Sequence, residues 1–296
     1  MAFQQPNIDP ILVQIGPFAI HWYGLMYLAA LGSAYFCANL RTKSANNNWH
    51  ANQVSDLVFF LFLGAVLGGR FGYVLFYNFE YFLSHPMFLI GWNGHTIEWA
   101  GMSFHGGLLG VLASAMWYAK KNKRTFFEVT DFIAPIIPLG LFFGRIGNFI
   151  NGELWGRPAG SDIYWSVTFK NAPLVHGLQV PRHPSQLYEA ILEGLVLFAI
   201  IWLYSNKERP RAAVSGLFLL GYGSFRFFVE FFREPDAGIG FILGTEWLTK
   251  GMLLSIPMVV FGGTMIVLAY KKKPILKLAN PILNYFNKSP KNKDKS

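Results

Sequence analysis

Seven apolar stretches, each close to the length that crosses a lipid bilayer, constrain this chain more than any other feature. A helix needs about 20 residues to span the hydrocarbon core. The stretches are residues 18–40, 57–77, 100–119, 131–150, 187–205, 213–232 and 252–270. Only 14% of the 296 residues are charged, against roughly 25% in a soluble domain, so the chain lacks the polar residues to cover a water-facing surface. The sequence therefore predicts an all-α integral membrane protein with seven transmembrane helices.

Basic residues set the expected orientation. Of the 25 Lys and Arg residues, 17 fall on one side of a seven-span arrangement and five on the other. Because cytoplasmic loops carry the excess of Lys and Arg, we expect the N-terminus outside and the C-terminus in the cytoplasm. The net charge of +9 reflects this asymmetry, so we expect contact with membrane lipids and no nucleic-acid partner.

The polar segments predict a simple domain organisation. We expect one seven-helix transmembrane domain over residues 1–273, followed by a lysine-rich cytoplasmic tail at 274–296. The one long insert, about 151–186, lies on the outer side and is predicted to form a small extracytoplasmic cap with a short strand at 164–169. The first 17 residues lack a basic n-region and a small-residue cleavage site, so they do not resemble a removable signal peptide.

Ionisable side chains inside membrane spans are expensive, so those present here are candidates for function. At about 1.5 Å of rise per residue, several of them lie roughly 8–10 Å from the outer ends of their spans. The candidates are Arg70, His105, Arg145 and Arg226, with Tyr23 at the same level and Glu230 beside them. A lone arginine near a helix end can simply snorkel to the interface. Several in one layer instead indicate a cationic pocket at headgroup depth, and the planar guanidinium fork suits a phosphate.

The segment 143–158 is rich in glycine and polar residues. It places Asn148 and Glu153 among glycines, which let helix backbones approach closely in membranes. The chain has no nucleophile elbow, zinc-protease or phosphate-loop motif, and its carboxylates are too scattered to indicate a metal site. Its single cysteine, Cys37, excludes an intrachain disulfide and is predicted to be a small buried hydrophobic residue.

Two carboxylate spacings stand out near the outer side. Arg226 and Glu230 are four residues apart, which allows a salt bridge on one helical face. Glu189 and Glu193 have the same spacing. Just before them, Ser185 is predicted to cap the start of the fifth span.

Six segments in this order resemble the prolipoprotein diacylglyceryl transferase family of bacteria. They are HWYGLMY at 21–27, GGRFGY at 68–73, GMSFHGG at 101–107, GRIGNFINGE at 144–153, RHPSQLYE at 182–189 and GYGSFR at 221–226. They run through nearly the whole chain, and the 144–153 segment resembles the family signature. The tail after about 273 and the insert 158–181 carry the least family signal.

The resemblance implies a reaction and its partners. The family moves the diacylglyceryl group of phosphatidylglycerol to the thiol of the lipobox cysteine in a preprolipoprotein signal peptide, forming a thioether and releasing glycerol 1-phosphate. This is the first step of bacterial lipoprotein maturation, and it implies a multi-pass protein of the cytoplasmic (inner) membrane. No metal and no organic cofactor is expected.

The resemblance also implies site residues. It carries over Arg145 and Arg226 as the essential arginine pair, which would hold the departing phosphate. The other residues implied for the active-site region are Tyr23, His105, Asn148, Glu153, Gly156, Tyr222 and Glu230. Arg70 is added as a substrate-binding candidate from its depth alone.

Alternatives stay open for the base and for the function. His105 is the first candidate to deprotonate the thiol, with Tyr23 or Glu230 behind it; His105 could also position substrate or pack a helix. A lipid or anion transporter would use the same arginines as a relay, but it predicts polar residues in the inner halves of the spans, which show few. A scaffold protein would not need a layer of buried cations.

Overall fold

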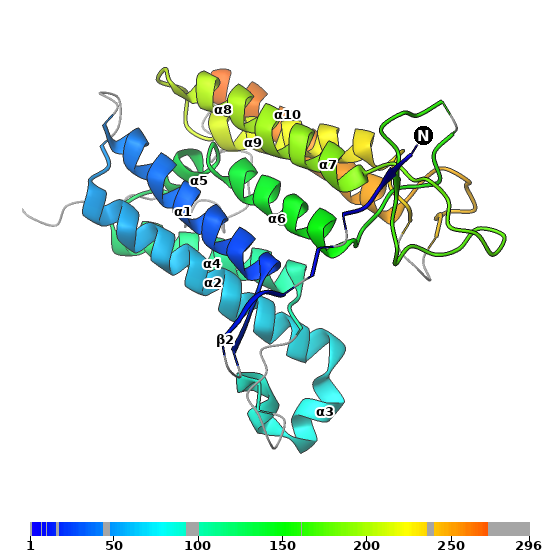
Figure 1. Cartoon of the computed structure of the whole chain (residues 1–296). Coiled ribbons are helices and arrows are strands. Elements are labelled where there is room, and N and C mark those ends of the chain that lie inside the picture. The colour runs from blue at the N-terminus through cyan, green and yellow to red at the C-terminus, as the bar shows by residue number, and fades with distance from the viewer. Residues whose placement is uncertain are drawn as a thin grey trace, which may run out of the picture. The chain divides into compact units, whose positions relative to one another are not determined.

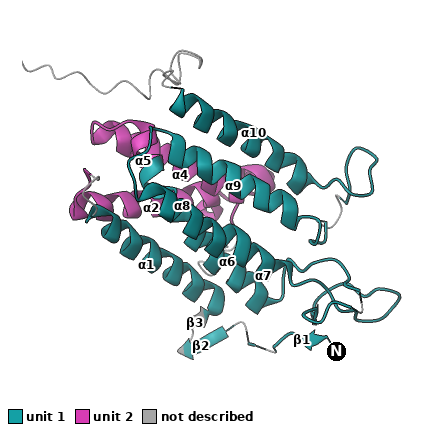
Figure 2. Ribbon diagram, turned by 90° about the horizontal axis from the view of Figure 1, so that it is seen from above, with its two compact units in different colours: residues 1–46, 131–275 teal, residues 47–130, 276–296 magenta. Residues whose placement is uncertain are grey.

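The structure is a computed structural model that describes residues 2–6, 8–9, 11–15, 18–43, 48–92, 101–160, 162–235 and 240–271. The predicted cytoplasmic tail at 274–296 lies outside the described residues. The described chain is mostly helical (Figure 1). It divides into two compact units (Figure 2): unit 1 is Met1–Asn46 with Asp131–Ile275, and unit 2 is Asn47–Thr130 with Leu276–Ser296.

Unit 1 holds most of the helices. They are α1 (Trp22–Thr42), α6 (Ile137–Asn151), α7 (Ser185–Glu189), the π-helix η2 (Ala190–Val196), α8 (Leu197–Ser205), α9 (Ala213–Val229) and α10 (Lys250–Tyr270). The chain runs from α7 through η2 into α8 without a break. Helix α1 packs against α6, α6 packs against α7 and η2, and α9 packs against α10 (Figure 2).

Small residues and apolar side chains hold these helices together. An ideal Cβ at Gly262 of α10 would lie 2.6 Å from the carbonyl oxygen of Gly216 on α9, so these two backbones are in direct contact. Leu197 and Ile201 of α8 are fully buried beside Val214 of α9. Close approach through glycine is the usual means of helix association in membranes.

A side chain of one helix caps another on unit 1. Asp131 accepts hydrogen bonds from the backbone N–H of Ala212 at 2.6 Å and of Ser215 at 2.8 Å, and from the Ser215 hydroxyl at 2.6 Å. These groups are at the start of α9, where backbone N–H groups have no partner within the helix. Asp131 is distant in the sequence, but its carboxylate caps the N-terminus of α9 as the side chain of an N-cap residue would.

Short strands accompany the helices in unit 1. Strand β1 (Phe3–Gln4) pairs in parallel with β4 (Val167–Thr168), and β2 (Ile11–Ile15) pairs with β3 (Phe18–His21) as an antiparallel hairpin. The strand predicted at 164–169 is thus present but shorter. The β1 and β2–β3 strands were not predicted.

Unit 2 contains α2 (Ala51–Tyr77), α3 (Phe79–Ser84), the 3-10 helix η1 (Pro86–Ile90) and α4 (Phe104–Lys121). Helices α2 and α4 meet through glycines: an ideal Cβ at Gly72 would lie 2.7 Å from the Cα of Gly106. Ser103 caps α4 by accepting from the N–H of Gly106 at 3.2 Å. The short helix α5 (Phe126–Ile133) crosses from unit 2 into unit 1.

Helix covers most of the described residues in each of the seven predicted stretches. Turn residues 134–136 break the fourth stretch into α5 and α6, next to Pro135 and Pro138, which cannot donate a helical hydrogen bond. The first stretch begins as strand β3 before α1. Within the described residues, three helices are long and apolar enough to cross a membrane: α2, the continuous Ser185–Ser205 and α10. The number is four if α5 and α6 form one broken span.

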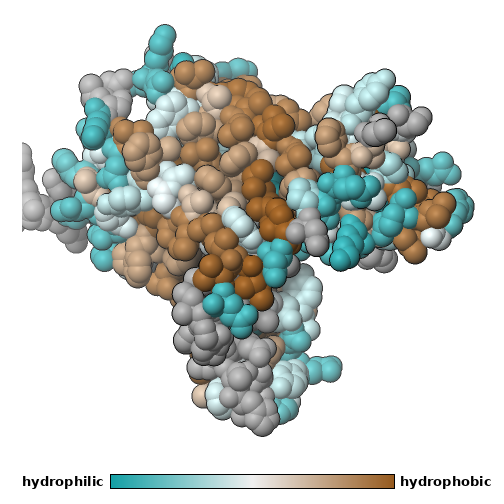
Figure 3. All heavy atoms as spheres, viewed as in Figure 1, coloured by the Kyte–Doolittle hydropathy of each residue, from teal (hydrophilic) through white to brown (hydrophobic). Residues whose placement is uncertain are grey.

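The surface over the helices suits a lipid environment. In the view of Figure 3, hydrophobic residues gather over the helices, and hydrophilic residues gather over the loops near β1 and β4 of unit 1. Large side chains exposed on helices include Phe59, Phe76 and Phe261, which a water-soluble protein would bury. These features support an all-helical type of membrane protein that crosses the bilayer several times.

Candidate active site

One buried carboxylate joins the two predicted arginines. Glu189, the last residue of α7, accepts from Nη1 of Arg226 through Oε1 at 2.7 Å. Its Oε2 lies 2.9 Å from Nε of Arg145 on α6. The Glu189 side chain is 0% exposed, whereas Arg145 and Arg226 are 17% and 12% exposed. Two guanidiniums from different helices are therefore held together by a single anion.

The network continues along α9. Nη2 of Arg226 lies 2.8 Å from Oε2 of Glu230, so the salt bridge predicted from their spacing is confirmed. Oε1 of Glu230 accepts from the hydroxyl of Thr249 at 2.9 Å. Nη1 of Arg233 approaches Glu230 to 4.0 Å. Arg226 thus has carboxylate partners on both terminal nitrogens, one on α7 and one just after α9.

Glu193 is a second buried carboxylate of this cluster, on the π-helix η2. Its Oε2 lies 3.7 Å from Nη2 of Arg145. Among the described residues neither of its oxygens has a hydrogen-bond partner. A buried carboxylate without hydrogen bonds is costly, and π-helical turns are frequent at functional sites. This segment therefore departs from ordinary helical packing where the charges are concentrated.

Two tyrosines border the arginines. Tyr222 of α9 is close enough to interact electrostatically with Glu193, Arg145 and Arg226. The ring of Tyr23 on α1 packs on Gly147 of α6, where an ideal Cβ would lie 2.8 Å from Tyr23 Cδ2. A glycine at this position is what allows the ring to sit close to Arg145, with which it also interacts electrostatically.

The polar residues that follow Arg145 form a separate, connected group at the end of α6. Nδ2 of Asn148 donates to Oε1 of Glu153 at 2.8 Å. The backbone carbonyl of Glu153 accepts from Nε2 of Gln186 at 2.6 Å, which ties this group to α7. Gly152 ends α6 in the left-handed conformation, with φ of 64°, as is common at helix C-termini.

Gly156 lies where three chain segments cross. Its N–H donates to the carbonyl oxygen of His183 at 2.9 Å, and Nη1 of Arg182 donates to its carbonyl at 3.1 Å. An ideal Cβ at Gly156 would lie 2.6 Å from the carbonyl oxygen of Phe232. The position requires a residue without a side chain, so Gly156 keeps these loops close to α7 and α9.

Arg70 and His105 belong to unit 2. The buried guanidinium of Arg70 donates from Nε to the carbonyl of Leu89 at 3.1 Å and from Nη2 to the carbonyl of Phe88. These are among the last carbonyls of η1, so Arg70 anchors that helix. His105 is exposed in the first turn of α4, with its ring edge-on to Phe104 at 5.6 Å.

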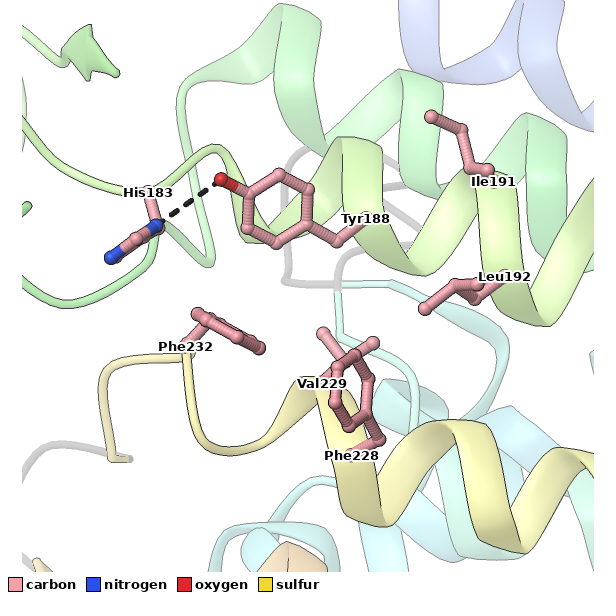
Figure 4. A pocket seen from close by; sticks show the side chains of 7 residues that line it. All are labelled: His183, Tyr188, Ile191, Leu192, Phe228, Val229 and Phe232. Carbon is pink, nitrogen blue, oxygen red and sulfur yellow. Dashed lines mark hydrogen bonds between the residues drawn. The ribbon is translucent and has the colours of Figure 1, made fainter. Parts of the chain in front are cut away.

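An apolar hollow lies in unit 1 between α7–η2 and the end of α9. Figure 4 shows the side chains that line it: His183, Tyr188, Ile191, Leu192, Phe228, Val229 and Phe232. The Tyr188 hydroxyl accepts from Nε1 of Trp165 at 2.7 Å and lies 3.1 Å from Nδ1 of His183 (Figure 4). Burial lowers the pKa of His183, and the carboxylate of Asp162 partly offsets this. The neutral imidazole that burial favours can accept a hydrogen bond from the Tyr188 hydroxyl through Nδ1. The apolar lining of the hollow suits a hydrocarbon chain.

Sequence reasoning missed the role of Glu189 and Glu193. It noted their spacing, which puts both on one helical face, but gave no reason to place that face against the two arginines. It was wrong on Ser185, which does not cap α7; its hydroxyl donates to the carbonyl of Leu154 at 3.0 Å. Cys37 is buried with a free thiol, as predicted. Within the described ranges, no group of His, Cys, Asp and Glu is placed to hold a metal ion.

Apolar helices that carry a buried, ion-paired cluster of arginines and glutamates define a multi-pass membrane protein with charged side chains gathered inside its helix bundle. The sequence profile described as prolipoprotein diacylglyceryl transferase matches residues 10–268. Three relatives are named phosphatidylglycerol–prolipoprotein diacylglyceryl transferase. The Photobacterium profundum protein is 55% identical over 91% of this chain and 96% of its own length. The Pseudoalteromonas atlantica protein is 54% identical over 94% and 95%, and the Pseudomonas putida protein 51% over 93% and 98%. The chain belongs to the prolipoprotein diacylglyceryl transferase family and is a membrane transferase.

Proposed function

We propose that this chain transfers the diacylglyceryl group of phosphatidylglycerol to the cysteine thiol of a prolipoprotein, the first step of lipoprotein maturation. The sulfur attacks the glycerol carbon that bears the phosphate, a carbon–sulfur bond forms, and the carbon–oxygen bond to phosphate breaks. The products are a thioether on the lipobox cysteine and glycerol 1-phosphate. The observation that carries this proposal is the convergence of Arg145 and Arg226 on one anion in a member of this family.

In this proposal the two arginines neutralise the departing phosphate. Charge accumulates on the phosphate oxygens as the carbon–oxygen bond breaks, and preorganised donors in a site shielded from water stabilise such charge strongly. Arg145 and Arg226 come from different helices, so the helix packing fixes their separation before the lipid arrives. A planar fork that donates two parallel hydrogen bonds also orients the phosphate.

The thiol proton needs an acceptor, because an ordinary thiol with a pKa near 8.5 is mostly protonated at neutral pH. We propose His105 as the base, with Tyr23 and Glu230 as the other candidates. Glu230 is already engaged by Arg226 and Thr249, which favours a positioning role for it. His105 is exposed on α4. This exposure favours His105 as the base, because a substrate thiol can reach its ring.

The remaining residues are proposed to shape the site. Tyr222 borders both arginines and would contact the headgroup. The pair of Asn148 with Glu153 would orient the polar part of a substrate, and Gly156 would fix the loop beside it. Arg70, bound to carbonyls of η1, would act by holding that segment in place.

We further propose the arrangement in the membrane. The chain would form one catalytic domain over residues 1–273, with seven spans, an outer N-terminus, an outer cap at about 151–186 and a cytoplasmic tail at 274–296. Its place would be the bacterial inner membrane, where phosphatidylglycerol and prolipoproteins meet. The hydropathy pattern and the asymmetry of Lys and Arg support this arrangement.

The test is a transfer assay with the purified protein in detergent. Phosphatidylglycerol and a peptide with a lipobox cysteine are incubated with it, and peptide mass and released glycerol 1-phosphate are measured. We expect the peptide to gain one diacylglyceryl group for each glycerol 1-phosphate formed. A peptide with serine in place of cysteine is the control and should gain nothing. Folded protein that leaves the cysteine peptide unmodified would contradict the proposal.

A further inference from the structure

Glu189 occupies the guanidinium groups that a phosphate would need. One oxygen accepts from Nη1 of Arg226 and the other lies 2.9 Å from Nε of Arg145. Carboxylates and phosphates are the two anions that match the guanidinium fork. The site assigned above to the lipid phosphate therefore already contains an anion that belongs to the protein.

We infer that Glu189 is a stand-in for the lipid phosphate: it holds Arg145 and Arg226 together when no lipid is bound, and it competes with the phosphate for them. This inference rests on the proposed function of the same site. Glu189 acts through the two arginines and does not itself touch the reacting atoms, so it is a positioning residue.

The holding role follows from the charges. Two guanidiniums that are brought together away from water repel each other, and this repulsion is stronger where the dielectric constant is low. Glu189 is fully buried and contacts both, so it compensates the two charges at once. Glu193 lies 3.7 Å from Arg145 and adds negative charge near both arginines, but at a longer distance than Glu189.

The competing role follows from the same contacts. A phosphodiester brings a negative charge of its own to a place where a carboxylate is already bound, so at least one contact of Glu189 must be given up or shared. Arg226 keeps a second partner, Glu230 at 2.8 Å. Arg145 is the more exposed arginine and its other carboxylate, Glu193, is more distant. The phosphate is therefore expected to replace Glu189 first at Arg145.

The experiment compares Glu189→Gln with wild type in the transfer assay, at saturating lipobox peptide and varied phosphatidylglycerol. The neutral amide no longer competes for the arginines, so KM for phosphatidylglycerol should fall by about tenfold, in the range of one close charge pair. The amide also holds the guanidiniums less well, so kcat should fall. A scaffold residue would lower kcat or the yield of folded protein without lowering KM. An unchanged or raised KM in folded Glu189→Gln would overturn the inference.

A second variant covers the case in which Glu189→Gln does not fold. Glu189→Asp keeps the charge but is one methylene shorter, so it can reach only one of the two guanidiniums and should give a KM for phosphatidylglycerol below that of wild type. A KM at or above the wild-type value would count against the inference. Glu246→Gln is the matched control, because Glu246 is exposed, and its KM and kcat should equal those of wild type.

Binding separates this inference from the proposed function. Intrinsic tryptophan fluorescence measures the affinity for phosphatidylglycerol in detergent micelles, in the absence of peptide. Micelles with phosphatidylcholine are the reference. If Glu189→Gln binds phosphatidylglycerol more tightly than wild type does, the inference is supported, even where no transfer occurs. Absence of transfer alone would reject only the proposed reaction. Equal or weaker binding by that variant rejects the inference even where transfer is normal.

Discussion

Arg145 and Arg226, 81 residues apart in the sequence, are ion-paired with opposite oxygens of one buried carboxylate. The two side chains come from α6 and α9, and the carboxylate comes from a third element, α7. Arg226 also pairs with Glu230 at the end of its own helix, whereas Arg145 and Glu189 find their ion-pair partners on other elements. The packing of three helices and the compensation of charge therefore depend on each other at this point.

The shared partner predicts that loss of the two arginines is not additive. Arg145→Ala and Arg226→Ala should each remove most phosphate neutralisation, so the double variant should be little worse than either single one, as for residues that act as a unit. The measurement is a double-mutant cycle on kcat/KM, normalised to folded protein. Strictly additive losses would instead indicate two separate sites, such as one for lipid and one for peptide.

Arg145→Lys should lose activity although the charge is kept. Arg145 presents Nε to Glu189 and Nη2 toward Glu193, and an ammonium group cannot offer two fixed directions at once. We expect kcat/KM to fall by about 10- to 100-fold, toward the cost of losing one preorganised donor, with the thermal unfolding temperature nearly unchanged. A lysine variant with wild-type turnover would show that charge alone is sufficient.

The helix positions could be predicted from hydropathy because burial in lipid demands long apolar runs, whatever packs against them. The break after Ile133 lies beside Pro135 and Pro138, which disrupt a helix for a local reason that the sequence contains. The Arg226–Glu230 pair followed from spacing on one helix. Rules of this kind predict contacts within one helix or strand, but not contacts between different elements.

The parts that escaped prediction depend on contacts between distant segments. The pairing of Phe3 with Val167 joins residues with no shared periodicity. The position of Glu189 between two arginines depends on how α6, α7 and α9 pack, which spacing on one helix does not determine. Arg70 and His105 were predicted at the depth of Arg145, yet they belong to the other compact unit.

Asp131→Ala should destabilise unit 1 without changing the chemistry. The substitution leaves two backbone N–H groups at the start of α9, those of Ala212 and Ser215, without their acceptor. Loss of such a cap costs about 1–2 kcal/mol, so the thermal unfolding temperature in detergent should fall while kcat of the folded fraction is kept. Asp9→Ala is the control, because Asp9 is exposed and accepts a local hydrogen bond from the N–H of Ile11. Equal unfolding temperatures for the two variants would argue against the cap.

Adjacent glycines of α10 offer a matched test of helix packing. A Cβ at Gly262 would press on the backbone of Leu220 and Gly216 of α9, whereas a Cβ at Gly263 meets nothing within 4 Å. Gly262→Ala should therefore cost about 1–3 kcal/mol, as overpacking does. Gly263→Ala should be neutral or stabilising by up to about 1 kcal/mol, because alanine favours helix. The comparison is made by thermal unfolding in the same detergent, and equal effects of the two substitutions would contradict the close contact of α9 and α10.

The orientation in the membrane can be tested with a single introduced cysteine. Asn171 is exposed in the proposed outer cap, and Cys37 is the only native cysteine, so Asn171→Cys in a Cys37→Ala background reports one position. The 17-to-5 distribution of Lys and Arg predicts an outer location for this cap. A membrane-impermeant maleimide should therefore label the introduced cysteine once the outer membrane is made permeable and the inner membrane is still sealed. A reporter enzyme that is active only in the cytoplasm should be active when it is fused after Lys273. A reporter that is active only outside the cytoplasm should be inactive at the same position. Labelling of the introduced thiol only after the inner membrane is ruptured would overturn the seven-span arrangement with an outer N-terminus.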